Sequence, residues 1–293
     1  MVYNMKNKCI LAFILSLIIS ITCYSQSNVM ESLSFHSNIL NRDISYSIYL
    51  PSGYNNSQRL YPALYLLHGY TDDQTAWLQS GNMQDITDKA ISNGNAAPMI
   101  VIMPDAWDTW YVNQYDGKMP YEDMFFKELI PFMEKTYRIR PDIRNRAISG
   151  LSMGGYGSFL YSLHHPDMFC ACCPLSAAVF TDEAMNNNSG SNAKSFIDLF
   201  HRLYGKNLEG WEKNSVLDIL KNMDKDKTPK VRYYIDCGDD DFLLDGNFEV
   251  HKLMKAKGIQ HEFRVRDGAH QWRYWRSALP TVLEFVSQPF LKN

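Results

Sequence analysis

Short, nearly unbroken apolar runs recur along most of the chain and predict buried strands. They are Ala63–Leu67, Met99–Met103, Ala147–Ser149, Cys170–Leu175 and Val231–Ile235, followed by a last strand at Phe263–Val265. Parallel strands that are covered on both faces lack the polar alternation of half-exposed strands. Helical spacing of apolar residues fills the intervals at Tyr121–Tyr137, Tyr156–His165, Phe196–Tyr204, Asn247–Lys257 and Trp272–Val286. This alternation predicts an α/β fold with a mostly parallel sheet and helices on both faces.

The pattern differs near the start of the chain, where apolar and polar residues alternate. Two such stretches, Leu33–Leu40 and Ile44–Leu50, are separated by the turn-forming residues Asn41–Asp43. Alternation of this kind is typical of strands with one exposed face. We therefore expect an antiparallel hairpin ahead of the parallel strands. A second expected boundary is Gly258, which is placed to end the helix at Asn247–Lys257.

Residues 1–25 have the features of an export signal. Lys6 and Lys8 precede a run of 14 apolar or small residues, Cys9–Thr22. A bilayer-spanning helix needs about 20 apolar residues, whereas the core of a signal peptide needs about 7–15. We expect cleavage near Ser25–Gln26, with the mature protein in the periplasm or outside the cell and not inserted in a membrane. An uncleaved membrane anchor and a lipoprotein attached through Cys23 are the alternatives.

The mature chain, residues 26–293, shows no proline- or serine-rich linker, so we expect a single domain. Its one compositional break is the polar stretch Asp182–Ala193. Together with Lys194–Lys227 this stretch is interpreted as an insertion above the sheet. Hydrophobic residues make up 45% of the chain and the net charge is −3, which excludes a disordered chain and argues against nucleic-acid binding.

Four cysteines remain after the proposed cleavage: Cys170, Cys172, Cys173 and Cys237. They lie in apolar, strand-like runs, where buried free thiols are the expected state. If the segment is a strand, the adjacent Cys172 and Cys173 point to opposite faces. A disulfide remains an alternative because the chain is expected to be exported. No HExxH pattern is present, so no metal site is expected.

The sequence Gly150-Leu151-Ser152-Met153-Gly154 is the strongest chemical signal. It follows a predicted strand and precedes a predicted helix, which is the context of the nucleophile elbow, a tight turn that exposes a reactive serine. Small residues two positions on either side of Ser152 let neighbouring backbone approach. The N-terminus of the helix also favours developing negative charge. Ser152 is therefore the predicted nucleophile.

A serine nucleophile needs a base, and the base needs an orienting acid. His270 follows the last strand in a glycine-containing loop and is the candidate base. Three aspartates, Asp239, Asp240 and Asp241, follow an earlier strand, and Asp241 lies far enough into the loop to turn back toward the histidine. Both loops leave carboxyl ends of strands, where open α/β sheets place their active sites. Asp239 and Asp240 remain alternatives.

The tetrahedral intermediate needs two N–H donors. One is the backbone of Met153, directly after the nucleophile. The other is expected from the loop after an early strand, which makes the backbone N–H of Tyr70 the candidate. His68, in the same loop, is interpreted as an internal brace.

These segments together resemble the esterase D and carbohydrate esterase family 1 group of α/β-hydrolases, which includes secreted feruloyl and acetylxylan esterases. The resemblance runs through LYLLHGYTDDQTAW, VIMPDAW, RAISGLSMGGYGSFLYSLHHPDMF, YYIDCGDDDFL and GAHQWRYWRSALP. It implies an α/β-hydrolase fold, a triad of Ser152, Asp241 and His270, and backbone donors at Tyr70 and Met153. It also implies that the enzyme uses no metal and no organic cofactor.

Aromatic residues near these motifs suggest the substrate. Trp107 follows a central strand and Trp272 follows the expected base, where flat side chains can stack on a sugar or a hydroxycinnamoyl group. Packing within the protein is the alternative for both, and it is the preferred interpretation for Trp275. The leading hypothesis is a secreted serine esterase that removes feruloyl or acetyl groups from plant polysaccharide or oligosaccharide. The alternatives are an S-formylglutathione hydrolase, a siderophore or small-molecule esterase, and an inactive carbohydrate-binding protein.

Overall fold

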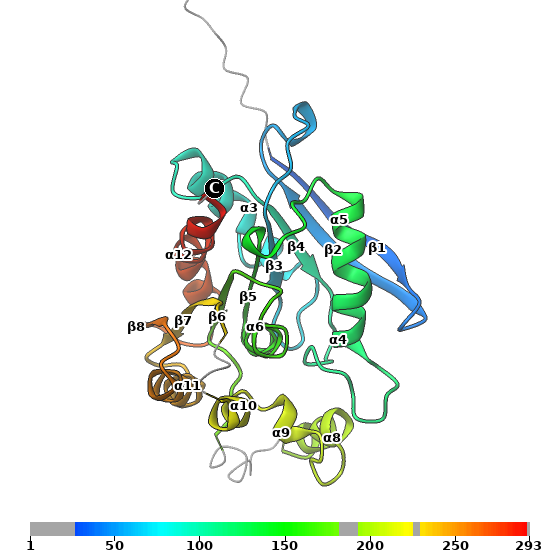
Figure 1. Cartoon of the computed structure of the whole chain (residues 1–293), viewed down its shortest axis with the longest axis vertical. Coiled ribbons are helices and arrows are strands. Elements are labelled where there is room, and N and C mark those ends of the chain that lie inside the picture. The colour runs from blue at the N-terminus through cyan, green and yellow to red at the C-terminus, as the bar shows by residue number, and fades with distance from the viewer. Residues whose placement is uncertain (1–26, 182–192, 225–228, 292–293) are drawn as a thin grey trace, which may run out of the picture.

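The sheet contains eight strands in the order β1-β2-β4-β3-β5-β6-β7-β8 within residues 27–181, 193–224 and 229–291, which the computed structural model describes (Figure 1). β2 runs antiparallel to β1 and β4, and the other neighbours are parallel. The predicted α/β fold with an N-terminal antiparallel hairpin is confirmed. The strands are β1 (Asn28–Ser37), β2 (Arg42–Leu50), β3 (Ala63–Leu67), β4 (Ile100–Pro104), β5 (Arg146–Leu151), β6 (Ala171–Leu175), β7 (Arg232–Gly238) and β8 (His261–Arg266).

Successive side chains of the central strands enter two separate hydrophobic cores, one on each face of the sheet. Cys172 packs in one core and Cys173 in the other, as the alternation along a strand requires. Both faces are covered, which explains why these strands read as unbroken apolar runs. All four cysteines of the described residues are free thiols.

Helices form a layer on each face (Figure 1). One layer contains α4 (Tyr121–Met124), α5 (Ile130–Thr136), α6 (Met153–His164), α8 (Ala193–Tyr204), α9 (Trp211–Asn214), α10 (Val216–Asn222) and α11 (Leu244–Lys257). The other contains α2 (Ala76–Gln79), α3 (Met83–Ser92) and α12 (Trp272–Leu291). Gly258 ends α11 at a φ of 75°, as predicted.

The turn of the N-terminal hairpin lies earlier than the sequence pattern predicted. It spans residues 38–41, and Arg42 and Asp43 belong to β2. The Glu128 carboxylate fixes this turn, because it accepts hydrogen bonds from the Ser37 hydroxyl and from the backbone N–H groups of Asn38 and Ile39. A distant side chain therefore sets the position of the turn.

Several helix boundaries also differ from the predictions. α6 begins at Met153, three residues before the predicted start, and α12 continues to Leu291. A π-helical segment, Phe125–Leu129, interrupts the predicted helix at 121–137. The helix α3 was not predicted, because Thr87 and Ala90 are two of its three buried residues and give little apolar signal.

The predicted insertion is described over 193–224 and forms α8, α9 and α10, which lie at the lower end of the molecule in Figure 1. The rest of its polar stretch, residues 182–192, and the predicted signal segment lie outside the described residues. Two side chains of α6 bind the backbone of α9: the Tyr156 hydroxyl donates to the Asn214 carbonyl at 2.7 Å, and His164 Nε2 donates to the Lys213 carbonyl at 2.8 Å. Among the helices of 27–181, 193–224 and 229–291, none is long and apolar enough to cross a membrane.

His164 joins the insertion to the body of the fold. Its Nδ1 lies 2.9 Å from Glu122 Oε1, so both ring nitrogens face acceptors, an arrangement that favours the protonated imidazolium. Burial lowers the pKa of His164, but the hydrogen bond and the charge of Glu122 outweigh burial and raise that pKa above 6.5. Burial likewise raises the pKa of Glu122, but His164 and His165 bring it down to about 2.

We predict that His164→Gln lowers the free energy of unfolding by about 1–2 kcal/mol near pH 6. Because the folded-state pKa of His164 is raised, its contribution is complete below the unfolded value of 6.5 and is lost as the pH rises through the folded value. Glu122 stays ionised throughout this range. Urea unfolding from pH 6 to pH 9 should therefore show the difference between wild type and H164Q shrinking with pH. The exposed His201 of α8 provides the control, because H201Q removes neither the contact with Glu122 nor the contact with Lys213. A constant difference for H164Q would contradict the assignment.

Candidate active site

Ser152 lies at the sharp turn between β5 and α6. Its φ and ψ are 54° and −118°, a conformation that L-residues rarely adopt. A Cβ atom on Gly150 would lie 2.5 Å from the Gly154 carbonyl oxygen, and one on Gly154 would lie 2.6 Å from the carbonyl oxygens of Leu67 and His68. Both positions therefore require glycine, and the close approach of the backbone holds the serine in its strained conformation.

Three side chains from separate loops converge at this turn. His270 Nε2 lies 3.0 Å from Ser152 Oγ, and His270 Nδ1 lies 3.0 Å and 3.1 Å from the two carboxylate oxygens of Asp241. The imidazole can thus accept the serine proton at Nε2 while it donates to the acid at Nδ1. Of the three aspartates considered, Asp241 is the one that reaches His270. Asp239 instead accepts the backbone N–H of Gly268 at 2.9 Å, within the loop that carries the histidine.

The acid remains ionised although it is buried. Burial raises the pKa of Asp241, but the hydrogen bond from His270 and the backbone N–H of Leu243 outweigh it, so the pKa lies below its ordinary value. An ionised carboxylate fixes the tautomer of the imidazole and stabilises the imidazolium that forms when the base takes a proton. Both the position of Asp241 and its negative charge therefore suit it to orient His270 and to stabilise the imidazolium.

A second buried carboxylate, Asp236, anchors the loop of His270 at both ends. It accepts hydrogen bonds from Arg266, the last residue of β8, and from the hydroxyl of Tyr274 in α12. The loop between these two residues contains His270. The ring of Trp275 also packs edge-on against the imidazole, with the ring centroids 4.9 Å apart. The preferred interpretation of Trp275 as a packing residue agrees with this arrangement and with its burial.

The two expected backbone donors lie beside Ser152. Met153 is the first residue of α6, and N–H groups in the first turn of a helix have no acceptor within the helix. Tyr70 follows Gly69, where a Cβ atom would lie 3.6 Å from Ser152 Cβ. His68 braces this loop as predicted: Nδ1 donates to the Gly69 carbonyl at 2.8 Å, and Nε2 accepts the N–H of Ala106 at 2.9 Å.

Trp107 and Trp272, the two predicted substrate contacts, are both partly buried against protein side chains. The Arg42 guanidinium lies 4.1 Å above the ring of Trp107, whose edge meets Tyr121. Trp272 packs edge-on against Trp77 at 5.3 Å. These contacts match the packing alternative that the sequence left open for each residue.

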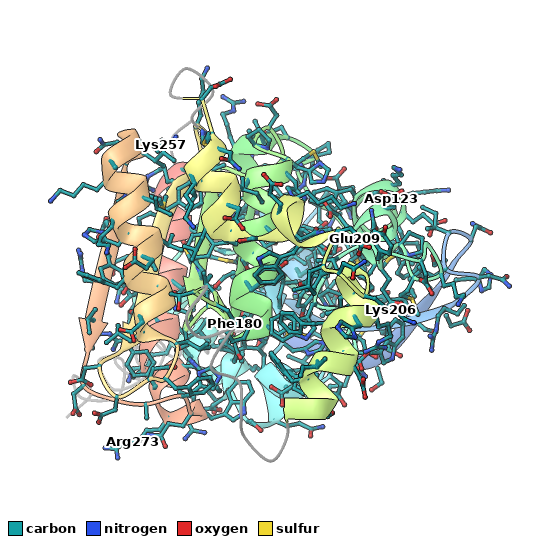
Figure 2. All side chains as sticks on the ribbon, turned by 90° about the horizontal axis from the view of Figure 1, so that it is seen from below. Asp123, Phe180, Lys206, Glu209, Lys257 and Arg273 are labelled. Atoms are coloured by element: carbon teal, nitrogen blue, oxygen red, sulfur yellow. The ribbon has the colours of Figure 1, made fainter. Side chains whose placement is uncertain are left out.

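An aromatic cluster that the sequence analysis did not assemble lies next to Ser152. The ring of Trp110, which is buried, contacts Tyr70, Tyr156 and Phe180. Phe180 lies between α8 and α11 in the view of Figure 2, and its ring meets Phe196 of α8 at 5.6 Å. Tyr70 is 40% exposed, so the cluster reaches solvent beside the predicted oxyanion donor. Because the members of this cluster are far apart in the sequence, no local sequence pattern predicted it.

Another residue missed from the sequence is Phe242, directly after Asp241. Its side chain is 75% exposed, and its ring lies 4.8 Å from the imidazole of His270. Within the part of the chain that the structure describes, no group of three histidine, cysteine, aspartate or glutamate side chains is arranged to hold a metal ion.

Comparison with known proteins identifies the family. The family described as "Putative esterase" matches residues 37–286, which is most of the chain. The chain belongs to this esterase family. A solved ferulic acid esterase is 36% identical to the esterase described here, with a TM-score of 0.79 over 90% of this chain and 99% of that one. The predicted family, the α/β-hydrolase fold and the activity of a carboxylic ester hydrolase are thus confirmed.

Two curated relatives extend the comparison. An acetyl esterase of Caldicellulosiruptor saccharolyticus is 27% identical to the esterase over 77% of this chain and 83% of that protein. An endo-1,4-beta-xylanase/feruloyl esterase of Xylanibacter ruminicola is 28% identical over 87% of this chain. The esterase spans only 31% of that second protein's length.

We predict that Asp241→Asn lowers the kcat of the esterase about 10³- to 10⁴-fold, because an amide donor facing Nδ1 forces the imidazole into the wrong tautomer. Asp240→Asn should change kcat less than about twofold, since the side chain of Asp240 is exposed and Asp241 is the acid that contacts His270. Hydrolysis of p-nitrophenyl acetate measures both variants. A larger loss in D240N than in D241N would reassign the acid.

Proposed function

We propose that this esterase hydrolyses ester bonds between a feruloyl group and plant polysaccharide, through a covalent acyl-enzyme at Ser152. The observation that carries the mechanism is the contact of His270 Nε2 with Ser152 Oγ at 3.0 Å, in line with the buried carboxylate of Asp241. This arrangement is what a serine needs in order to act as a nucleophile at neutral pH.

In the first half-reaction, Ser152 Oγ attacks the ester carbonyl carbon while His270 Nε2 takes the serine proton. The backbone N–H groups of Tyr70 and Met153 stabilise the oxyanion that forms. The tetrahedral intermediate collapses, the carbon–oxygen bond to the alcohol breaks, and His270 returns the proton to the departing oxygen. In the second half-reaction His270 activates water, which attacks the acyl-enzyme and releases the acid. Asp241 stabilises the imidazolium in both steps.

The aromatic cluster favours a feruloyl group over smaller acyl groups. Tyr70 and Phe180, which pack on the buried ring of Trp110, provide apolar, flat surface beside the proposed oxyanion site. An aromatic acyl group gains offset or edge-to-face contacts there that an acetyl group cannot make. The similarity to a ferulic acid esterase supports this choice. The similarity to an acetyl esterase makes acetylated xylan the second candidate.

We predict that Ser152→Ala abolishes hydrolysis of every ester and prevents labelling by a fluorophosphonate probe, with the fold intact by circular dichroism. In the wild type, kcat/KM should be at least about tenfold higher for methyl ferulate than for p-nitrophenyl acetate or acetylated xylan. Retained turnover by S152A would refute the nucleophile. A preference for acetylated xylan would refute the feruloyl assignment but would not affect the assignment of Ser152 as the nucleophile.

We also propose that the protein is exported and processed near Ser25–Gln26, since its expected substrates are polymers outside the cell. Expression of the full chain in a bacterial host should give a periplasmic or secreted product whose N-terminus, read by mass spectrometry, begins close to Gln26. A mature protein that retains residues 1–25 in the membrane fraction would contradict this, and a lipid-modified N-terminus at Cys23 would replace it with the lipoprotein alternative.

A further inference from the structure

The side chain of Phe242 has an environment unlike that of its neighbours. It follows the buried Asp241 and precedes the buried Leu243, yet it is itself 75% exposed. Its ring lies 4.8 Å from the imidazole of His270, tilted by 53°. Single exposed apolar residues are common on protein surfaces. This one, however, lies beside the proposed base.

The order of the strands separates the two halves of a bound ester. Ser152 follows β5, the loop of Tyr70 follows β3 on one side of it, and the loops of Asp241 and His270 follow β7 and β8 on the other. The carbonyl oxygen of the ester faces the backbone donor of Tyr70. The departing oxygen must lie within reach of His270 Nε2, because that atom returns the proton to it. The alcohol half of the substrate therefore extends toward the side of the sheet that carries Phe242.

We propose that Phe242 is the platform on which the sugar ring of the departing alcohol stacks, an inference that rests on the proposed function. One face of a sugar ring presents C–H groups, which pack well on a flat aromatic ring. The ring of Phe242 is free to receive it, since most of its surface is open to solvent. The same loop carries exposed carboxylates at Asp239 and Asp240, and the first turn of α11 adds that of Asp245; these charges repel anions. The platform therefore suits a neutral sugar rather than a uronic acid.

The test compares two esters that share an acyl group and differ in the alcohol: methyl ferulate and a feruloylated arabinoside. Phe242→Ala should lower kcat/KM for the arabinoside about 3- to 10-fold, mainly through a higher KM, and change kcat/KM for methyl ferulate less than about twofold. Phe242→Trp should keep wild-type activity toward the arabinoside. Because Phe242 is exposed, F242A should fold like the wild type, which thermal unfolding checks.

Phe248 provides the matched control. It is also an exposed phenylalanine, 47% accessible, but it lies on α11 and contacts His251 and Phe263 rather than His270. Phe248→Ala should leave both substrates unaffected. An equal loss of kcat/KM on both esters in F242A would show that Phe242 acts by positioning His270. No loss on either ester would show that Phe242 has no role. Either result would contradict the proposal that Phe242 is a platform for the sugar ring.

The acyl group is kept constant within each pair, so the test does not depend on the feruloyl assignment. If the wild type prefers acetyl esters, methyl acetate and an acetylated xyloside replace the first pair. The acyl group that the wild type prefers then tests the proposed function. The ratio of kcat/KM between the two esters of a pair tests the role of Phe242.

Discussion

The active site depends on the close approach of backbone segments at the turn after β5. Gly150 touches Gly154, and Gly154 in turn meets the carbonyl groups at the end of β3. A side chain at either glycine would push these segments apart. The same contact holds Ser152 at a positive φ and brings the loop of Tyr70 against it. The proposed nucleophile and the proposed oxyanion donors are therefore placed by one packing arrangement, and the strain is offset by the surrounding sheet and helix.

The parts of the fold that sequence could predict are those governed by local rules. Unbroken apolar runs identified the central strands, and the glycines around Ser152 identified the turn, because these patterns report on neighbouring backbone. The histidine was found because it follows the last strand. Asp241 was separable from Asp239 and Asp240 only by its place in the loop, and the structure adds the reason: Asp239 binds the backbone of the histidine loop.

The parts that could not be predicted depend on contacts between distant residues. The hairpin turn is fixed by Glu128, some ninety residues away, so the local Asn41–Asp43 signal misplaced it. The sequence also did not indicate that the guanidinium of Arg42, from β2, lies over the ring of Trp107. No sequence pattern distinguished Phe242, because the role proposed for this loop residue depends on its contact with the imidazole of His270.

The four free thiols are held in a form that reacts slowly. Burial raises the pKa of Cys170 and of Cys172 to about 12, and it also raises the pKa values of Cys173 and Cys237. The thiolate is the species that exchanges with disulfides and reacts with oxidants. In the folded protein the raised pKa values hold these groups as neutral thiols, which react more slowly than thiolates. The architecture of residues 27–181, 193–224 and 229–291 contains no disulfide and therefore needs no oxidant to form.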